Sequence, residues 1–153
     1  MPILGSRHFH WSDEAACAAH AAALAQRPAL KKAFIELHGG LGAGKTTFVR
    51  HLLRALGATG RIKSPTFAVM EPYELPSLNA WHFDFYRFDD PREWADAGFR
   101  DIFAAPGLKL AEWPEKAQRA LPTPDLRLFI DAQADDSRRV RAEAGTALGL
   151  ELL

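Results

Sequence analysis

The sequence predicts a single α/β domain. Apolar segments of strand length alternate along the chain with segments whose apolar residues recur at helical spacing, which is the pattern of this fold class. A glycine-rich loop at residues 39–44 lies between one such strand and one such helix. The chain has 153 residues, which suits one compact core, so we expect residues 1–153 to form one domain.

The first helix is predicted to begin at Ser12 and to end near Gln26. Ser12 can cap this helix, and the negative charges of Asp13 and Glu14 suit the positive end of its dipole. Pro28 then ends the helical segment, because proline lacks the N–H group that a helix interior needs.

A strand, a loop and a second helix follow. Residues 33–38 are mostly apolar and are predicted to form a buried strand. After the glycine-rich loop, residues 45–56 are predicted to form an amphipathic helix, which Gly57 ends.

The second half of the chain is predicted to hold further strands and short helices. One helix is predicted from Asp90 to Gly98, and another begins at Pro114. Pro72 is predicted to lie in a turn. We predict strands at residues 67–70, 81–86 and 108–112, and a hairpin formed by residues 126–133 and 138–143.

Composition excludes several classes of function. Lys plus Arg and Asp plus Glu each number 19, so the formal net charge is zero and no long-range basic field for nucleic acid or membranes is expected. The single cysteine, Cys17, cannot form an internal disulfide, and we expect it to be a buried thiol. The first residues lack a signal-peptide pattern and no apolar run is long enough to span a membrane, so we expect a cytoplasmic protein.

The glycine-rich loop matches the phosphate-binding pattern G-x-x-x-x-G-K-[ST] from Gly39 to Thr46. Glycines allow backbone N–H groups to approach phosphates closely, and the helix that follows directs its positive end at them. Lys45 is expected to reach the β- and γ-phosphates, and the Thr46 hydroxyl is expected to bind magnesium. The sequence therefore predicts binding of a nucleoside triphosphate with magnesium.

Two acidic residues are candidates for a second magnesium ligand. Asp84 lies on an otherwise aromatic strand, and Glu112 lies at the carboxyl end of another, where α/β sheets bind ligands. Each has an equally good structural explanation. Asp84 fits the solvated face of an alternating strand, and Glu112 fits the positive end of the next helix.

Other polar residues have weaker claims on function. Thr66 could sense a γ-phosphate, although the segment also reads as a plain turn into a strand. His82 is interpreted as a hydrogen-bonded structural histidine. The arginine-rich run at residues 138–141 is interpreted as a solvated strand face.

Four blocks of sequence occur together in the order found in one known family. Residues 39–48 read GGLGAGKTTF, 63–67 read KSPTF, 82–87 read HFDFYR and 111–116 read AEWPEK. This ordered set resembles the TsaE (YjeE) family, the ATPase of bacterial threonylcarbamoyladenosine synthesis on tRNA. The resemblance extends over about residues 10–145.

The resemblance implies a P-loop NTPase-like domain, with a mixed central sheet flanked by helices and weak, magnesium-dependent ATP hydrolysis. The implied partner is the TsaB–TsaD complex, in which TsaD transfers threonylcarbamoyl to tRNA. The ATPase would reset that complex between cycles and would meet tRNA only indirectly.

The resemblance also assigns roles to residues. It implies catalytic roles for Lys45, Thr66, Asp84 and Glu112, with Trp113 beside them, and magnesium binding by Thr46, Asp84 and Glu112. The residues expected to contact ATP or ADP are Gly39, Gly40, Leu41, Gly42, Ala43, Gly44, Lys45, Thr46, Thr47 and, near the base, Glu14. Gly40 is a departure, because the family usually has Asp there.

Two other functions compete with this interpretation. A P-loop fold can also belong to a small-molecule kinase, but such an enzyme needs an acceptor pocket and a closing lid, and no segment of the sequence suggests either. A nucleotide switch that binds a partner without hydrolysis is the other alternative. The guanine-recognition pattern N/T-K-x-D of a GTPase is missing from the sequence.

Overall fold

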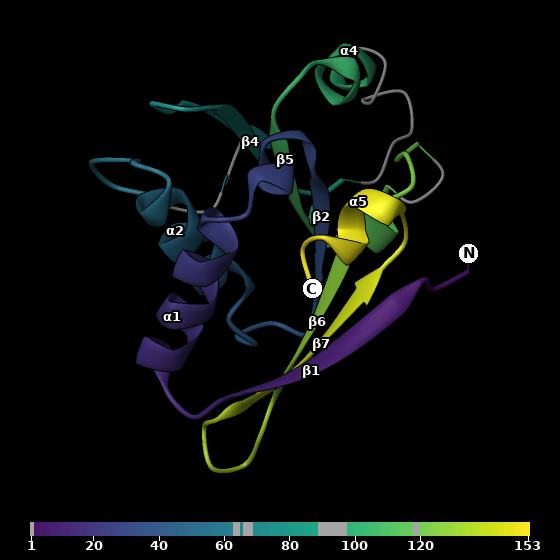
Figure 1. The fold of residues 1–153 in the computed structure, drawn as a ribbon. Coiled ribbons are helices and arrows are strands. Elements are labelled where there is room, and N and C mark those ends of the chain that lie inside the picture. The colour runs from purple at the N-terminus through teal and green to yellow at the C-terminus, as the bar shows by residue number, and fades with distance from the viewer. Residues whose placement is uncertain (1, 63–64, 66–68, 89–97, 118–119) are drawn as a thin grey trace.

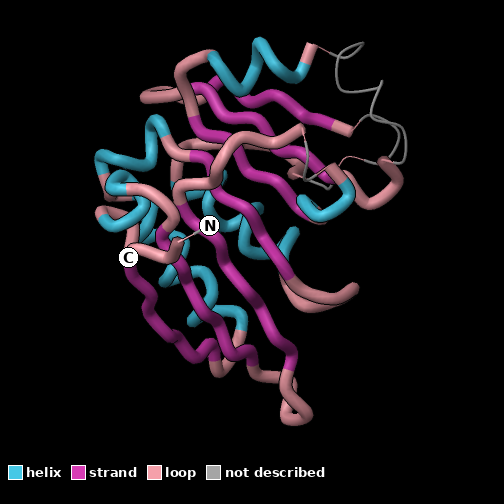
Figure 2. Tube along the Cα trace, turned by 90° about the vertical axis from the view of Figure 1, so that its right-hand side faces the viewer, coloured by secondary structure: helices cyan, strands magenta, loops and turns pink. Residues whose placement is uncertain are grey.

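A computed structural model describes residues 2–62, 65, 69–88, 98–117 and 120–153. In this part of the chain seven strands form one mixed sheet, with helices packed against it (Figures 1 and 2). The strands are β1 (Gly5–Trp11), β2 (Phe34–His38), β3 (Met70–Glu74), β4 (Asn79–Asp84), β5 (Leu108–Glu112), β6 (Leu126–Ala132) and β7 (Arg138–Ala144). The helices are α1 (Glu14–Ala25), α2 (Lys45–Ala55), α4 (Phe99–Ala104) and α5 (Ala147–Leu150), with single 3-10 segments at Pro28–Lys32 and Pro114–Lys116.

The strand order is β1-β7-β6-β2-β5-β4-β3. The four central strands β6, β2, β5 and β4 are parallel, whereas β1, β7 and β3 run antiparallel to their neighbours. This arrangement confirms the predicted α/β fold with a mixed central sheet. It also brings the carboxyl ends of β2, β5 and β4 to one edge of the sheet, where ligands bind in such folds.

Two layers of apolar side chains bury the centre of the sheet. On one face α1 and α2 lie side by side (Figure 1) and share a core with Ile35 and Leu37 of β2. On the other face α4 packs through aromatic rings, with ring centroids 4.9 Å apart for Phe34 and Phe103. Because β2 is covered on both faces, residues 34–37 are all buried, Glu36 included, and the strand is buried as predicted.

Several predicted boundaries are wrong for identifiable reasons. The cap of α1 is Asp13 and not Ser12, because the Asp13 carboxylate accepts the Ala16 N–H group at 2.9 Å. Pro72 lies inside β3 and not in a turn, which is possible because β3 is an edge strand. Gly98, with φ of +70°, precedes a helix that was not predicted, α4, and the helix that it is expected to end lies in residues outside the described part of the chain.

Other differences concern elements that were missed or shifted. Strand β4 ends at Asp84, two residues before the predicted end, and the helix expected at Pro114 is one 3-10 turn. Strand β1 and helix α5 were not predicted. The helix expected from Asp90 lies outside the described residues as far as residue 97.

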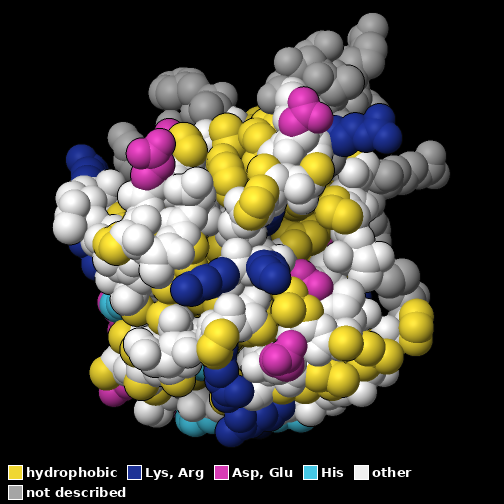
Figure 3. Space-filling model, turned by 45° about the horizontal axis from the view of Figure 1, so that its top comes forward, with side chains coloured by type: hydrophobic (Ala, Val, Ile, Leu, Met, Phe, Trp, Pro, Cys, Tyr) yellow, Lys and Arg dark blue, Asp and Glu magenta, His cyan; other side chains and the backbone are white. Residues whose placement is uncertain are grey.

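The surface carries both signs of charge. On the face drawn in Figure 3, basic and acidic side chains occur together, in keeping with the formal net charge of zero. Among the residues described above, no helix has the length and apolar character needed to cross a membrane.

Candidate functional site

The glycine-rich loop connects the end of β2 to the first residue of α2. Gly42 and Gly44 have φ values of +76° and +112°, which side chains disfavour. A Cβ atom on Gly39 would lie 2.6 Å from the carbonyl oxygen of Ile130 on β6. The loop is therefore shaped by its glycines and is held close to the neighbouring strand.

Lys45 begins α2 and is only 5% exposed. Its ammonium group donates to the Gly39 carbonyl at 2.5 Å and lies 3.4 Å from the ring centroid of Trp113. Burial lowers the pKa of Lys45, and nearby carboxylates, led by Glu112, act in the opposite direction. A concentrated positive charge is thus placed inside the loop, where an anion would bind.

Glu112, at the end of β5, faces the first turn of α2. The Thr46 hydroxyl lies 2.9 and 3.0 Å from the two carboxylate oxygens, and Glu112 is only 2% exposed. His82 on β4 is fully buried, and its Nε2 lies 2.6 Å from the same carboxylate. Since the carboxylate accepts, His82 is the donor, and its Nδ1 has no hydrogen-bond partner among the described residues.

Asp84 lies beside Glu112, because the two residues pair in the parallel register of β4 and β5. Its Oδ1 accepts the Tyr86 N–H group at 3.0 Å. Strand alternation places Asp84 on the same sheet face as the buried His82, and this face is covered by α2. His82 is therefore buried, whereas Asp84, at the end of β4, is half-buried and borders a cavity.

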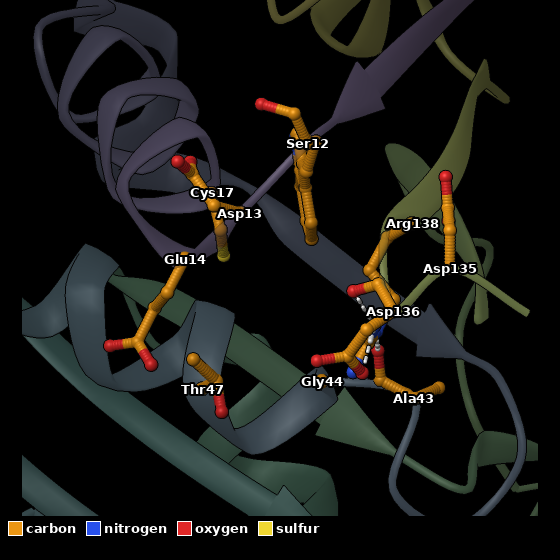
Figure 4. A pocket seen from close by; sticks show the side chains of 11 residues that line it. Ser12, Asp13, Glu14, Cys17, Ala43, Gly44, Thr47, Asp135, Asp136 and Arg138 are labelled. Carbon is orange, nitrogen blue, oxygen red and sulfur yellow. Dashed lines mark hydrogen bonds and ion pairs between the residues drawn. The ribbon is translucent and has the colours of Figure 1, made fainter. Parts of the chain in front are cut away.

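Two cavities adjoin the loop. One of about 370 Å³, the P-loop cavity, is lined by Leu41, Gly42, Ala43, Gly44, Lys45, Thr46, Thr47, Asp84, Tyr86, Glu112, Trp113 and Arg138. The other, of about 340 Å³ and termed the hairpin cavity, is lined by Trp11, Ser12, Asp13, Glu14, Cys17, Ala43, Gly44, Thr47, Asp135, Asp136 and Arg138. Figure 4 shows the hairpin cavity between the start of α1 and the turn that joins β6 to β7.

The structure brings most of the predicted site residues together. Residues 41–47 line one cavity together with Asp84, Glu112 and Trp113, whereas Gly39 and Gly40 are not part of its wall. Glu14 lines the other cavity, where its carboxylate lies 2.9 Å from His51 Nε2. Thr66 lies outside the described residues. A Cβ atom on Gly40 would meet no atom within 4 Å, so the position is open.

Sequence reasoning missed Arg138. This residue was grouped with a solvated arginine run, but its side chain is 22% exposed and its Nε donates to the Ala43 carbonyl at 2.6 Å. A signal was present, because alternation along β7 groups Arg138 with the buried Val140 and Ala142. The acidic turn residues Asp135 and Asp136 were also missed, since only the fold brings them to the P-loop.

Comparison with known proteins relates the sequence to one family. Residues 11–140 match the family model "Threonylcarbamoyl adenosine biosynthesis protein TsaE". The TsaE protein of Haemophilus influenzae is 41% identical over 123 residues, which are 80% of this chain and 77% of that protein. The TsaE protein of Bacillus subtilis is 37% identical over 106 residues, 69% of this chain and 66% of that protein.

A solved structure extends the similarity to the fold. The crystal structure of YdiB from Bacillus subtilis superimposes with a TM-score of 0.82 at 26% identity, over 99% of this chain and 94% of that chain. The family model alone covers most of the sequence. The chain therefore belongs to the TsaE family and has its role in the biosynthesis of threonylcarbamoyladenosine on tRNA.

Proposed function

We propose that this protein binds ATP with magnesium, hydrolyses it slowly, and thereby drives the threonylcarbamoyladenosine modification of tRNA through a partner complex. The observation that carries this proposal is the contact between Thr46 and Glu112. A hydroxyl group at the first turn of the P-loop helix meets a buried carboxylate from the end of a neighbouring parallel strand, at 2.9 and 3.0 Å. Phosphoryl-transfer sites use this pairing of groups.

The nucleotide would occupy both cavities. Backbone N–H groups of residues 39–44, the start of α2 and the Lys45 ammonium group would bind the phosphates of ATP or ADP. The hairpin cavity continues from the same loop through Gly44 and Thr47 and would hold the nucleoside, with Glu14 on its wall. In this proposal the phosphates lie in the P-loop cavity and the nucleoside lies in the hairpin cavity, which is why the loop borders both.

The residues present fit a magnesium ion that is shared with phosphates. The hydroxyl of Thr46 and the carboxylates of Asp84 and Glu112 are hard oxygen donors, which magnesium prefers. Among the described residues no cluster of three or more His, Cys, Asp and Glu could hold a metal alone. A bound magnesium ion would neutralise charge on the β- and γ-phosphates.

Each catalytic candidate then has a role that follows from its position. Lys45 would stabilise the negative charge that grows on the transferred phosphoryl group. Asp84 and Glu112 would orient the ligands around that group, with Glu112 held in place by His82. Thr66 would respond to the γ-phosphate, as the family resemblance implies.

The partner in this proposal is the TsaB–TsaD complex. TsaD would carry out the transfer to tRNA, and hydrolysis of ATP by the present chain would reset the complex between cycles. The formal net charge of zero supports indirect contact with tRNA, because a protein that binds nucleic acid by itself usually carries an excess of basic residues.

Glu112→Gln tests the ATPase directly. The variant keeps the shape of the side chain but loses its charge, so we expect ATP to bind while single-turnover hydrolysis with magnesium falls by about 100-fold. Glu74→Gln is the matched control, because Glu74 is exposed on edge strand β3. Phosphate release and nucleotide binding would be measured for both variants and the wild type.

Two results would contradict the proposal. Hydrolysis by Glu112→Gln at the wild-type rate would remove Glu112 from the mechanism. Transfer of the γ-phosphate to a small metabolite by the isolated wild-type chain would instead indicate a kinase.

A further inference from the structure

A half-buried arginine lies between the two cavities. Arg138 is the first residue of β7, its side chain is 22% exposed, and it lines both the P-loop cavity and the hairpin cavity. It shares a strand face with the buried Val140, whereas the neighbouring Arg139 lies on the opposite, exposed face. The strand thus directs one arginine inward, toward the P-loop.

The Arg138 guanidinium group joins the P-loop to the β6–β7 turn. Its Nε donates to the Ala43 carbonyl at 2.6 Å, and one terminal nitrogen donates to the Gly42 carbonyl at 3.5 Å. The other terminal nitrogen donates to the carbonyl groups of Asp136 at 2.6 Å and Ser137 at 3.2 Å. Figure 4 shows this side chain beside Ala43 and Asp136. One side chain therefore fixes two loops that are far apart in sequence.

The two P-loop carbonyls have a direct relation to phosphate binding. Each belongs to a planar trans peptide unit, so the N–H group of the next residue points away from the carbonyl oxygen. Fixing the Gly42 and Ala43 oxygens therefore fixes the directions of the Ala43 and Gly44 N–H groups, of which the Ala43 N–H group donates to the Gly40 carbonyl at 3.2 Å within the loop. The loop needs such an anchor, because glycine at positions 42 and 44 leaves the free backbone many conformations.

We propose that Arg138 is a positioning residue for nucleoside di- and triphosphates. It holds the peptide unit that follows Ala43 in the orientation that presents the Gly44 N–H group to phosphate, and it places a positive charge where the P-loop cavity meets the hairpin cavity. This inference rests on the proposed ATP-binding function and adds a residue from the C-terminal hairpin to that site.

The planar fork of arginine is essential to this role. It offers several N–H donors in fixed directions and so reaches carbonyls on both loops at once, whereas a lysine ammonium group is a point charge on a flexible stem. Arg138→Lys keeps the charge but loses the fork, and Arg138→Gln loses both. Arg139→Gln makes the same change of charge on the exposed face of the same strand.

The experiment measures ADP and ATP binding with magnesium by calorimetry, together with kcat and KM for hydrolysis. We expect affinity for both nucleotides to fall about tenfold or more in Arg138→Gln, by a smaller factor in Arg138→Lys, and by less than about twofold in Arg139→Gln. KM for ATP should rise by a larger factor than kcat falls. General damage to the fold would instead lower the folded fraction and kcat, and the affinity losses of the three variants would not follow the order given above.

The outcomes separate this inference from the proposed function. If the wild type binds ATP and Arg138→Gln binds it as well as Arg139→Gln does, the role of Arg138 is overturned and the ATPase stands. If Arg138→Gln fails to fold, the milder Arg138→Lys is compared with Arg139→Gln in the same way, and equal affinity again overturns the role of Arg138. If the wild type binds neither nucleotide, the proposed function itself fails.

Discussion

The first two glycines of the P-loop are glycine for different reasons. A Cβ atom on Gly39 would lie 2.6 Å from the Ile130 carbonyl oxygen and 3.0 Å from the Ala43 Cβ, so a side chain there must displace backbone. Gly40 has open space around the same position. The TsaE family usually has Asp in place of Gly40, and the structure offers no steric obstacle to that carboxylate.

This difference predicts unequal costs of substitution. Gly39→Ala should lower the free energy of unfolding by about 1–3 kcal/mol, because it overpacks the contact between the P-loop and β6. Gly40→Asp should change it by less than about 0.5 kcal/mol. Urea unfolding of the two variants beside the wild type measures both values. A larger loss for Gly40→Asp than for Gly39→Ala would show that the loop does not pack against β6 in this way.

Individual site residues differ in how far the sequence could reveal them. Lys45 and Thr46 belong to a phosphate-binding motif whose residues are consecutive, so the motif can be recognised from the sequence alone. The contact between Thr46 and Glu112 joins residues far apart in sequence and depends on strand order, so pattern alone left Glu112 undecided. Arg138 was missed because its basic neighbours suggested that the whole segment is exposed to solvent. The alternation of side chains along β7, however, places Arg138 on the same face as the buried Val140.

At the scale of elements, His20 connects α1 to its surroundings. The Trp11 indole N–H donates to His20 Nδ1 at 3.1 Å, and the Phe9 ring centroid lies 4.1 Å from that of the imidazole. Burial lowers the pKa of His20 from 6.5 to about 4, and the charge of Arg7 acts in the same direction. The junction of α1 and β1 therefore requires a neutral histidine.

The pKa of His20 predicts a pH dependence of stability. The unfolded chain binds a proton near pH 6.5 and the folded chain only near pH 4, so the free energy of unfolding falls as the pH is lowered between these values, by at most about 3 kcal/mol. His20→Gln lacks this contribution, so its stability curve should converge with that of the wild type toward pH 4. Urea unfolding from about pH 4.5 to 8 tests this, with the exposed His8→Gln as control. Parallel curves for wild type and His20→Gln would contradict it.

Elements were predictable where their signal is local. The strand β2 is mostly apolar, and the helix α2 and the β6–β7 hairpin have apolar residues at regular spacing, so all three were found with small boundary errors. β1 was missed because polar residues dominate it and its stability comes from pairing with β7, at the other end of the chain. α4 was missed because Gly98 reads equally as the end of one helix and as the start of another.

At the scale of the molecule, four separate parts of the chain meet at one edge of the sheet. The P-loop follows β2, the acidic residues stand at the ends of β4 and β5, and Arg138 comes from the C-terminal hairpin. The strand order that brings these parts together could not be predicted from the sequence, because the pairing of strands that are distant along the chain produces no local sequence pattern. Leu41 and Tyr86, which are 74% and 43% exposed, line the P-loop cavity and leave apolar surface at its edge.

The resetting role leads to a prediction about turnover of the whole assembly. If ATP hydrolysis by this chain resets TsaB–TsaD, a reconstituted system with Lys45→Ala should form no more than about one modified tRNA per complex. The reason is that the variant lacks the buried ammonium group that is proposed to bind the phosphates of ATP. Lys32→Ala is the control, since Lys32 is an exposed lysine in the segment before β2. Its assembly should turn over repeatedly, as the wild type does. Measuring the amount of threonylcarbamoyladenosine per complex over time distinguishes single from repeated turnover. Repeated turnover with Lys45→Ala would show that tRNA modification does not depend on ATP use by this chain.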